Sequence, residues 1–228
     1  MSHRPSKDRI YPQFARIAQA LASEKRLELL DLLAQASRNV DALADETGMS
    51  VANTSQHLQA LLAARLVETH RQGTRVFYSL AGDDVLRLCL DLRNVAESRL
   101  AEIGVITRDF AGEFDGAPHV PRDDLEQLLN NGKVHLIDVR PRIEFESGHL
   151  TGAVSIPVEE LPERIDSLPR HLPIIAYCRG EYCLFADEAV AFLRERGFQA
   201  SRLEGGWPEW KTEGRGVESG SPPVIHTV

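Results

Sequence analysis

Two cysteines five residues apart, in the segment CRGEYC (178–183), are the residues of this sequence best placed to do chemistry. Cys178 directly follows the apolar strand candidate PIIAY (173–177), and a helical segment follows the loop. A thiol between a strand end and a helix start lies among backbone N–H groups, which together with the helix dipole stabilise a thiolate. Arg179 adds positive charge, and Gly180 permits a tight loop. The segment predicts an anion cradle with a nucleophilic sulfur at its base; a buried cysteine at a strand end is the plainer alternative.

The motifs around this loop form an ordered set. They are IDVR (137–140), Glu144-Phe145, GHLTGAVSIP (148–157), YCRGEYC (177–183) and GGWPEW (205–210). In this order they resemble a single-domain rhodanese, a sulfurtransferase, over about residues 118–215. The resemblance implies that Cys178 is the nucleophile that forms a persulfide, and that Asp138 and Arg140 support the loop. It implies a scaffold role for Glu144 and His149.

The loop departs from the rhodanese pattern at its last position. Cys183 stands where active rhodaneses commonly carry an arginine, which helps to hold an anionic donor such as thiosulfate. Glu181 adds a negative charge to the same loop. Both differences weaken the binding of an anion, because a bidentate donor is lost and like charges repel. We therefore expect low thiosulfate:cyanide sulfurtransferase activity.

Cys183 has two interpretations. It is a packing residue at a helix start, or it is a resolving thiol that attacks a Cys178 persulfide to give an internal disulfide or a bridged polysulfide. Oxidation through a sulfenic acid leads to the same disulfide. Sequence does not show whether the two sulfurs meet, because a disulfide requires Cα atoms within about 7 Å. We expect a covalent persulfide or disulfide rather than a bound cofactor, and no metal site, because no histidine is near these thiols in the sequence.

The first hundred residues predict a unit that reads DNA. Helical segments at Val40–Thr47 and from Ser50 to about Arg65 are separated by Gly48, and two β-prone runs within 68–80 flank Gly73. This order is a winged helix-turn-helix, whose second helix reaches base edges while the wing contacts phosphate or the minor groove. The predicted DNA-contacting residues are Ser50, Asn53, Thr54, Ser55, Gln56 and His57 of the helix and Arg71 and Arg75 of the wing. An ordinary helical bundle with a polar face is the alternative.

The stretch MSVANTSQHLQALLAARLVETHRQGTRVFYSL (49–80) resembles the ArsR-type family of dimeric bacterial repressors, and the resemblance extends over roughly residues 12–110. The matching patterns are T-S-x-H-L-x-x-L in the helix and R-x-G-x-x-x-x-Y-x-L in the wing. The resemblance implies a homodimer on double-stranded DNA with an inverted repeat, its half-sites about one helical turn apart. The Cys pairs and His/Asp clusters with which many family members sense metals are absent here, so no metal site is expected. Cys89, between two leucines, is expected in the core.

These patterns place two domains in the chain, a mainly α winged helix-turn-helix and an α/β rhodanese-like domain with a parallel sheet. Strand candidates at 134–139, 153–157 and 173–177 alternate with helical segments, as in a parallel sheet covered by helices. The expected boundaries are 1–110 for DNA binding and dimerisation, 111–121 for a linker, 122–215 for the rhodanese-like domain and 216–228 for a flexible tail. One long helix from Asp83 to Phe110 is expected to pair the dimer and to lead into the second domain, which makes it the candidate coupling element.

Composition and charge limit the remaining function classes. The 228 residues carry a formal net charge of −8, but residues 1–100 hold 13 Lys and Arg against 12 Asp and Glu, whereas residues 101–228 hold 13 against 22. This asymmetry fits two domains with different partners, so the acidic total does not exclude DNA. The sequence lacks the roughly 18-residue apolar run of a membrane span, the apolar stretch of a signal peptide and the even cysteine count of a disulfide framework. We expect a cytoplasmic protein without a membrane partner.

The two halves together favour a dimeric transcriptional regulator whose DNA binding responds to reactive sulfur or redox state through Cys178 and Cys183. Its effector would be a small sulfane-sulfur donor. Three alternatives stay open. The protein is a sulfurtransferase that carries sulfur as a Cys178 persulfide, with the first domain only regulating or localising it; the rhodanese-like domain is an inert oligomerisation module; or the loop holds arsenate or another oxyanion.

Overall fold

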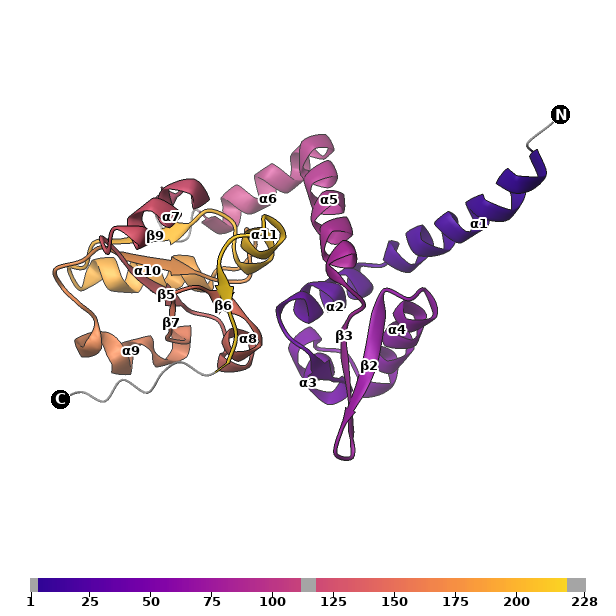
Figure 1. Cartoon of the computed structure of the whole chain (residues 1–228), viewed down its shortest axis with the longest axis horizontal. Helices are drawn as coiled ribbons and strands as arrows, with labels where there is room; N and C mark the ends of the chain where they lie inside the picture. The colour runs from indigo at the N-terminus through magenta and orange to yellow at the C-terminus, as the bar shows by residue number, and fades with distance from the viewer. Residues whose placement is uncertain (1–3, 112–117, 221–228) are drawn as a thin grey trace. The chain divides into compact units, whose positions relative to one another are not determined.

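Residues 4–111 and 118–220 are described in the computed structural model, which Figure 1 colours along the chain. They fall into two units, one ending at Leu92 and the other beginning at Arg93. The division lies inside helix α5 (Asp83–Arg99), well before the segment 111–121 at which the sequence pattern predicts the change of domain. Val85 near the start of α5 packs into the N-terminal core, so the first turns of this helix belong to that unit.

The N-terminal unit has a helical core. Leu29, Leu43, Leu58 and Leu61 are fully buried in one apolar cluster, which draws three helices together. These three helices are α2 (Glu24–Gln35), α3 (Val40–Thr47) and α4 (Val51–Ala63), and α1 (Arg4–Leu21) precedes them. The spacing of apolar residues does not reveal α1, because Pro12 lies within it and most of its side chains are exposed.

The turn between α3 and α4 forms as predicted. Gly48 adopts a φ of 64°, the left-handed conformation that ends α3, and its N–H donates to the carbonyl of Ala44. The Oγ of Ser50 accepts a hydrogen bond from the backbone N–H of Asn53 at 3.3 Å and so caps α4. Ser23 occupies the N-cap position of α2, but its side chain makes no capping hydrogen bond.

A β-hairpin follows α4 and forms the wing. Strands β2 (Val67–Gln72) and β3 (Arg75–Leu80) are antiparallel, and Gly73 in the turn between them has a φ of 61°. The short strand β1 (Arg38–Asn39), which the sequence pattern did not reveal, pairs with the other edge of β3. The predicted winged helix-turn-helix is confirmed.

The long helix expected from Asp83 to Phe110 is instead two helices. α5 ends at Arg99 and α6 (Ala101–Ala111) begins after Leu100. Residues 98–102 include neither Pro nor Gly, so the local composition carries no signal for the break. The Leu100 carbonyl accepts the N–H of Ile103 at 3.1 Å, which starts the first turn of α6.

The C-terminal unit contains a parallel sheet with the strand order β4-β9-β8-β5-β7. Its strands are β4 (His119–Val120), β5 (His135–Asp138), β7 (Val154–Ser155), β8 (Ile174–Tyr177) and β9 (Ala200–Leu203). β8 is central, and its Ile175 lies between Leu136 of β5 and Ser201 of β9. The three predicted strand segments all form strands. β9 was not predicted, because Ser201 and Arg202 interrupt its apolar character.

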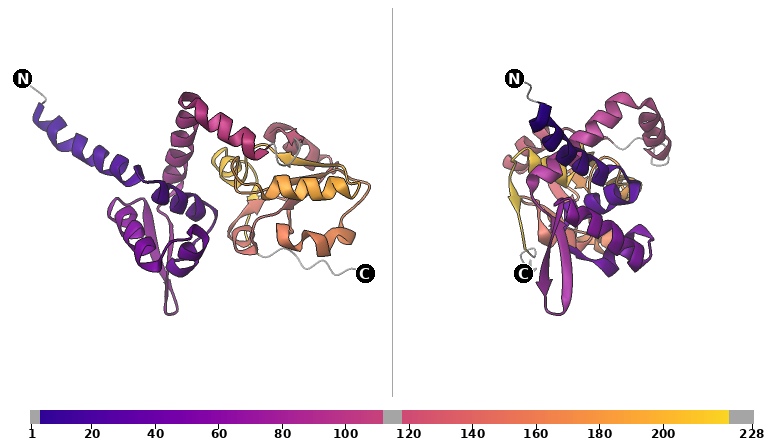
Figure 2. Two further views of the ribbon diagram at one scale, coloured as in Figure 1. Left: turned by 180° about the vertical axis from the view of Figure 1, so that it is seen from behind. Right: turned by 90° about the vertical axis from the view of Figure 1, so that its right-hand side faces the viewer.

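Helices cover both faces of this sheet, as the reverse view in Figure 2 shows for α10. On one face Ile137 packs in a cluster with Val190 of α10, and on the other Ile175 packs in a cluster with Trp207 of α11. Alternate residues of the strands therefore face opposite helical layers, as in the predicted α/β fold. The helices are α7 (Arg122–Asn130), α8 (Arg142–Ser147), α9 (Leu161–Arg164), α10 (Phe185–Glu195) and α11 (Trp207–Thr212).

The segments predicted as linker and tail contain short strands. Within the predicted linker, residues 112–117 lie outside the described part, while His119–Val120 is β4 and pairs with β9. Within the predicted tail, β10 (Val217–Glu218) pairs with β6 (His149–Leu150), and residues 221–228 lie outside the described part. The C-terminal fold thus extends beyond the predicted 122–215 at both ends, because backbone pairing, which composition does not reveal, holds these segments.

Candidate functional site

The loop between β8 and α10 brings two thiols together. Cys178, the first residue after β8, is fully buried, and its Sγ donates a hydrogen bond to the backbone carbonyl of Cys183 at 3.1 Å. Cys183 is partly exposed, and both residues are free thiols. Gly180 has a φ of 146°, a conformation that side chains disfavour. The sequence left open whether the sulfurs meet; the fold places them in one bend.

Polar groups of the loop converge on the sulfur of Cys183. The hydrogen bond from Cys178 is the largest of the causes that lower the pKa of Cys183 to about 7, and the backbone N–H groups of Arg179 and Phe185 add to it. Burial raises the pKa of the Cys178 thiol well above its usual range, and the neighbouring Cys183 raises it further. This is the reverse of the expectation that the cradle stabilises a Cys178 thiolate. The physical reason is burial: Cys178 is shielded from water, which disfavours its charged form more than the backbone of Gly180 favours it, whereas Cys183 is partly exposed.

Arg179 does not present a free positive charge to the thiols. Its Nε lies 2.9 Å from Oε1 and 3.1 Å from Oε2 of Glu144, a carboxylate that is fully buried in α8. Because this ion pair offsets the guanidinium charge, Arg179 has only a small lowering effect on the pKa of Cys183. Glu144 thus holds one side of the loop, in the scaffold position that the rhodanese resemblance implies.

A buried network joins the ends of β5 and β8. The Nη2 of Arg140 lies 2.6 Å from Oδ2 of Asp138 and donates to the carbonyl of Gly148 at 2.7 Å. The Oη of Tyr177 donates to the same Oδ2 at 2.6 Å, and all three side chains of this network are fully buried. Tyr177 immediately precedes Cys178. The network therefore fixes the strand end from which the cysteine loop departs.

The backbone of the GGWPEW segment packs directly on the loop. A Cβ at Gly206 would lie 2.4 Å from the carbonyl oxygen of Cys178 and 2.5 Å from the nitrogen of Gly180. The N–H of Trp207 donates to that same Cys178 carbonyl at 3.2 Å. The sequence indicated this motif, but it did not show that the backbone of the motif packs on the cysteine loop. The close approach requires a residue without a side chain at position 206.

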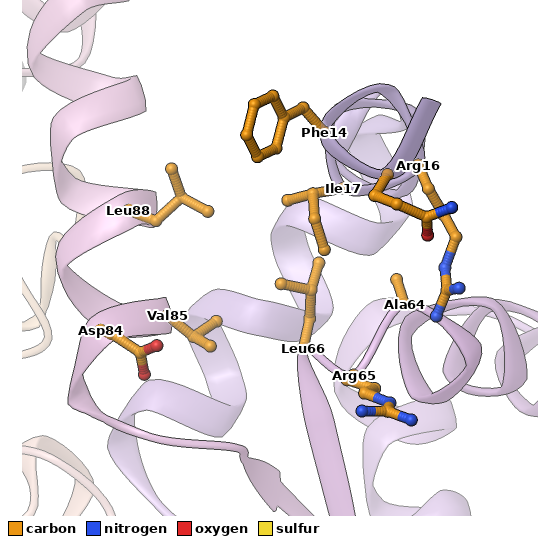
Figure 3. Close-up of a pocket in the computed structure, with 10 residues that line it drawn as sticks. Phe14, Arg16, Ile17, Ala64, Arg65, Leu66, Asp84, Val85 and Leu88 are labelled. Carbon is orange, nitrogen blue, oxygen red and sulfur yellow. The ribbon is translucent and has the colours of Figure 1, made fainter. Parts of the chain in front are cut away.

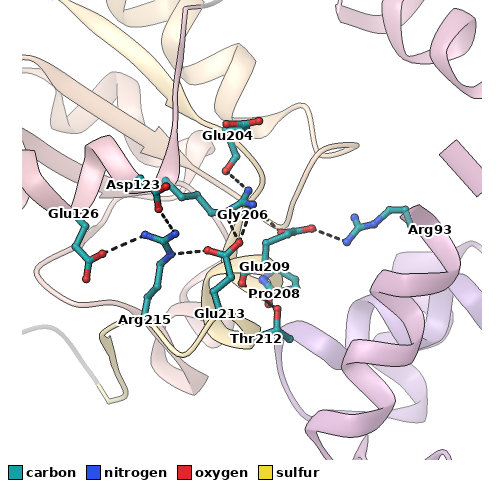
Figure 4. A network of polar contacts seen from close by, with 11 residues as sticks. Arg93, Asp123, Glu126, Glu204, Gly206, Pro208, Glu209, Thr212, Glu213 and Arg215 are labelled. Atoms are coloured by element: carbon teal, nitrogen blue, oxygen red, sulfur yellow. Dashed lines mark hydrogen bonds and ion pairs between the residues drawn. The ribbon is translucent and has the colours of Figure 1, made fainter. Parts of the chain in front are cut away.

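Ion pairs surround the other side of this segment (Figure 4). Glu209 accepts a hydrogen bond from the backbone N–H of Gly206 at 2.9 Å and pairs with Arg93 at 2.6 Å. Arg215 pairs with three carboxylates, those of Asp123, Glu126 and Glu213. Glu209 therefore links the segment that packs on the cysteine loop to α5, and Arg215 links the residues after α11 to α7.

Most of the predicted DNA-contacting residues are accessible to solvent in the N-terminal unit. Ser50 is exposed and serves as the N-cap of α4. Most of the others are exposed or partly exposed, namely Asn53, Ser55, Gln56 and His57 on α4 and Arg71 and Arg75 on the wing. This arrangement offers hydrogen-bonding side chains at the start of a helix and two guanidinium groups on a hairpin, which are the groups that read base edges and bind phosphates.

Thr54 does not belong to this accessible set. Its side chain is fully buried, and its Oγ1 donates to the carbonyl of Ser50 at 3.0 Å. Positions 54, 58 and 61 share one face of α4, and Leu58 and Leu61 are fully buried with it. The prediction that Thr54 contacts DNA is therefore wrong, because helical spacing turns this residue toward the core.

An apolar cavity of about 580 Å³ lies among α1, the end of α4 and the start of α5 (Figure 3). Phe14 and Ile17 of α1 line it, together with Leu66, Val85 and Leu88. Phe14 is 64% exposed and Leu88 is 38% exposed, so large apolar groups stand open to solvent here. Sequence reasoning missed the α1 part of this surface because it did not place a helix there.

Other classes of site receive no support from the part of the chain that the structure describes. Within residues 4–111 and 118–220, no helix has the length and apolarity that crossing a membrane requires. The same residues contain no cluster of three or more His, Cys, Asp or Glu side chains arranged to hold a metal ion. Cys89, the third cysteine, was expected in the core; it is only partly buried and packs against the N-terminal core cluster.

Two family models match the chain. The model described as bacterial regulatory protein, arsR family, matches residues 23–69, and the model described as rhodanese-like domain matches residues 121–213. The two matched segments contain, respectively, the predicted recognition helix and the cysteine loop.

Similar proteins have been described for the whole chain and for its parts. HTH-type transcriptional regulator Rv0324 of Mycobacterium tuberculosis is 42% identical over 216 residues, which cover 95% of each chain. Human thiosulfate:glutathione sulfurtransferase is 36% identical over 91 residues, 39% of this chain and 77% of that protein. The solution structure of a homodimeric winged helix-turn-helix DNA-binding domain from Mycobacterium bovis is 46% identical and covers 44% of this chain and 91% of that one, with a TM-score of 0.41.

Proposed function

The chain belongs to the ArsR family of HTH-type transcriptional regulators, in a form that carries a C-terminal rhodanese domain, and on this premise we propose that its DNA binding responds to reactive sulfur or redox state at Cys178 and Cys183. The observation that carries the proposal is the placement of two free thiols in one loop, where the fully buried Cys178 donates a hydrogen bond to the carbonyl of the partly exposed Cys183 at 3.1 Å. Burial raises the pKa of Cys178, whereas the groups around Cys183 lower its pKa to about 7. This is the arrangement of an attacking and a resolving cysteine.

The chemistry follows from the unequal thiols. The Cys183 thiolate attacks the outer sulfur of a persulfide RS–SH, which forms Cys183–S–SH and releases RS⁻. Cys178 then attacks the inner sulfur, forming the Cys178–Cys183 disulfide and expelling HS⁻, which leaves with the Cys178 proton as H₂S. Two thiols are oxidised, and the donor is reduced to a thiol and H₂S. Cys183 thus reacts first, whereas the family resemblance implies a persulfide on Cys178.

The DNA side of the proposal rests on α4 and the wing. Asn53 and Gln56 can form bidentate hydrogen bonds with adenine in the major groove, while Arg71 and Arg75 neutralise phosphates. The exposed apolar groups of α1 and α5, including Phe14 and Leu88, supply a surface that a second copy would cover. A symmetric dimer of this kind binds an inverted repeat.

A candidate route from the loop to the DNA-binding domain runs through α5. Tyr182, between the two cysteines, donates a hydrogen bond from its Oη to Glu97 of α5 at 2.5 Å, and the Arg93 guanidinium lies 5.8 Å from the centre of its ring. Val85 in the first turn of the same helix is part of the N-terminal core. Closing a disulfide around Tyr182 would change the contact that one end of this helix makes. Regulation requires only that the two loop states favour different dimer geometries, typically by about 1–3 kcal/mol.

The test is a DNA-binding titration with the region upstream of the protein's own gene, at one fixed salt concentration. Reduced protein is compared with protein treated with polysulfide. We expect the affinity to change by about tenfold or more, and the change to disappear in Cys178→Ser and Cys183→Ser. Cys89→Ser is the matched control, because it removes the third thiol outside the loop and should respond like the wild type. Unchanged affinity after full modification of the loop would refute the proposal.

A sulfurtransferase role is the second candidate. It is favoured by the similarity of the C-terminal domain to human thiosulfate:glutathione sulfurtransferase. In that case the DNA-binding domain only regulates or localises the enzyme. A Cys183→Ser variant that keeps full regulation of DNA binding and still passes sulfur to an acceptor thiol would favour this role over a sensor. Thiosulfate itself is expected to be a poor donor, because Cys183 and Glu181 stand where an anion would bind.

A further inference from the structure

A second cavity, of about 540 Å³, borders the cysteine loop within the C-terminal unit. Tyr182 and Leu184, the residues on either side of Cys183, form part of its wall. Ile103 and Ile106 of α6 form another part. Its volume lies in the range of sites that bind small organic molecules, roughly 300–1,000 Å³. Neither cysteine lines the cavity, but the residues that flank Cys183 in the chain do, so the cavity borders the loop that carries the two thiols.

One buried polar group in this cavity lacks a partner. Arg202 lines the cavity and is only 4% exposed. Its Nη1 pairs with Asp187 at 2.5 Å and its Nη2 donates to the carbonyl of Gly180 at 3.2 Å, whereas its Nε has no hydrogen-bond partner among the described residues. A buried N–H without an acceptor is unfavourable. That N–H is shielded from solvent, but the guanidinium groups of Arg202 and Arg93 both line the cavity and attract a ligand carboxylate.

The rest of the wall selects against a bare inorganic anion. Ile103, Ile106 and Leu184 present apolar surface that thiosulfate or sulfide would leave in contact with water. Asp187 and Glu181 also line the cavity. Their negative charges repel an anion unless its charge lies next to Arg202. A molecule with a carbon body and a carboxylate at one end satisfies both the apolar wall and Arg202.

We propose that this cavity binds a small organic persulfide that carries a carboxylate and presents its outer sulfur to Cys183. The inference rests on the proposed function and names its donor class. In the transfer, the Cys183 thiolate bonds to the outer sulfur, the donor S–S bond breaks, and the donor leaves as an organic thiolate with the electron pair. The donor's apolar body stays against α6 while its outer sulfur reaches the loop.

The binding step is tested with S-methylglutathione, a thioether with carboxylates that cannot transfer sulfur. Its affinity for the full-length protein is measured by titration calorimetry. Ile106→Trp fills the cavity, and Val105→Trp is the matched control, because Val105 is the adjacent residue of α6 and is 49% exposed against 53% for Ile106 but does not line the cavity. We expect Ile106→Trp to weaken binding by about tenfold or more and Val105→Trp to change it by less than about twofold. Absence of saturable binding to the wild type, or equal loss in both variants, would overturn the inference.

The transfer step is tested with two donors. Mass spectrometry follows sulfur addition to Cys183 in Cys178→Ser protein, from glutathione persulfide and from inorganic tetrasulfide. We expect Ile106→Trp to slow transfer from the organic donor by about tenfold and to leave transfer from tetrasulfide nearly unchanged. Equal slowing of both donors would show that the substitution damaged the loop and would overturn the inference. Failure of the proposed function, seen as DNA binding that ignores sulfur, leaves the calorimetric result standing, so the two failures are distinguishable.

Discussion

The thiol of Cys178 donates a hydrogen bond to the backbone carbonyl of Cys183 at 3.1 Å. This contact directs the buried thiol toward the second cysteine, and it uses the proton of the Cys178 S–H group. The neighbouring Cys178 and the backbone N–H groups of Arg179 and Phe185 lower the pKa of Cys183. The thiol that is more accessible is therefore also the one that ionises more easily.

The order of reactivity of the two thiols can be measured by alkylation. Because the pKa of Cys183 is lowered to about 7, its thiolate fraction rises through neutral pH, and its reaction with iodoacetamide should accelerate between about pH 5 and pH 9 with a midpoint near 7. Cys178 should react much more slowly throughout, because burial raises its pKa. Peptide mass spectrometry assigns each label, and preferential labelling of Cys178 at neutral pH would contradict this order.

The same experiment on Cys178→Ala tests the cause of the low pKa. The hydrogen bond from Cys178 is the largest contribution that lowers the pKa of Cys183. Removing the donor should move the midpoint of Cys183 alkylation to higher pH, by about one unit, toward the usual value of a cysteine. Cys89→Ala is the control and should leave the midpoint unchanged, since Cys89 lies in the N-terminal core. A midpoint that stays near 7 in Cys178→Ala would mean that the backbone N–H groups suffice.

Substitution of Gly206 by alanine should distort the cysteine loop. The added Cβ would lie 2.4 Å from the Cys178 carbonyl oxygen, so the loop backbone must move. We expect a loss of about 1–3 kcal/mol in the free energy of unfolding of the C-terminal domain, together with a loss of the alkylation preference for Cys183. Gly104→Ala is the control, because nothing lies within 4 Å of a Cβ there and α6 should gain about 0.5–1 kcal/mol. Equal stability of the two variants would contradict the packing described here.

The buried pair of Asp138 and Arg140 should be a major determinant of stability. Asp138→Asn leaves the fully buried guanidinium of Arg140 without its carboxylate, which should cost about 3–5 kcal/mol. Tyr177→Phe removes one hydrogen bond to the same carboxylate and should cost about 1–2 kcal/mol. Denaturant unfolding followed by tryptophan fluorescence reports this domain, because both tryptophans of the chain, Trp207 and Trp210, belong to it. A larger loss of unfolding free energy in Tyr177→Phe than in Asp138→Asn would contradict the major role given to the ion pair.

The sequence predicted the two folds because their signals are local. Gly48, Ser50 and Gly73 lie at the turn and cap positions that their residue types predict, and the strand before Cys178 is a continuous apolar run. Motif order then identified the rhodanese-like domain. These features depend on neighbours in the chain, so composition and spacing report them.

The site could be predicted only in part, because its details depend on long-range packing. No local pattern shows that Cys178 is fully buried while Cys183 is partly exposed, since burial depends on the packing of the surrounding elements. The use of Gly206 depends on a contact with a loop almost thirty residues earlier. The burial of Thr54 follows from helical spacing, and a count of apolar positions on α4 would have found it.

Substitutions on α4 and the wing should affect DNA binding in different ways. Gln56→Ala removes a candidate base contact, so it should cost about 1–3 kcal/mol on the operator and relax its sequence preference. Arg71→Ala should weaken binding to all sequences similarly and reduce the slope of affinity against salt concentration by about one. Thr54→Val keeps the buried shape and removes no exposed group, so it should leave the sequence preference unchanged. A salt slope that is altered by Gln56→Ala and untouched by Arg71→Ala would invert these roles.

The apolar surface of α1 and α5 should be required for dimerisation. Phe14 and Leu88 are large, exposed and line the same cavity, so a charge at either position would be buried against the second copy. We expect Phe14→Glu and Leu88→Glu to sediment as monomers at concentrations at which the wild type is a dimer. Both variants should lose operator binding together with dimerisation. Ile143→Glu is the control, because Ile143 is 49% exposed on α8 of the other unit and should remain dimeric. Because a dimer doubles the DNA contacts made by one complex, the monomeric variants should also show a salt slope about half that of the wild type. Persistence of the dimer in both charged variants would exclude this surface as the interface.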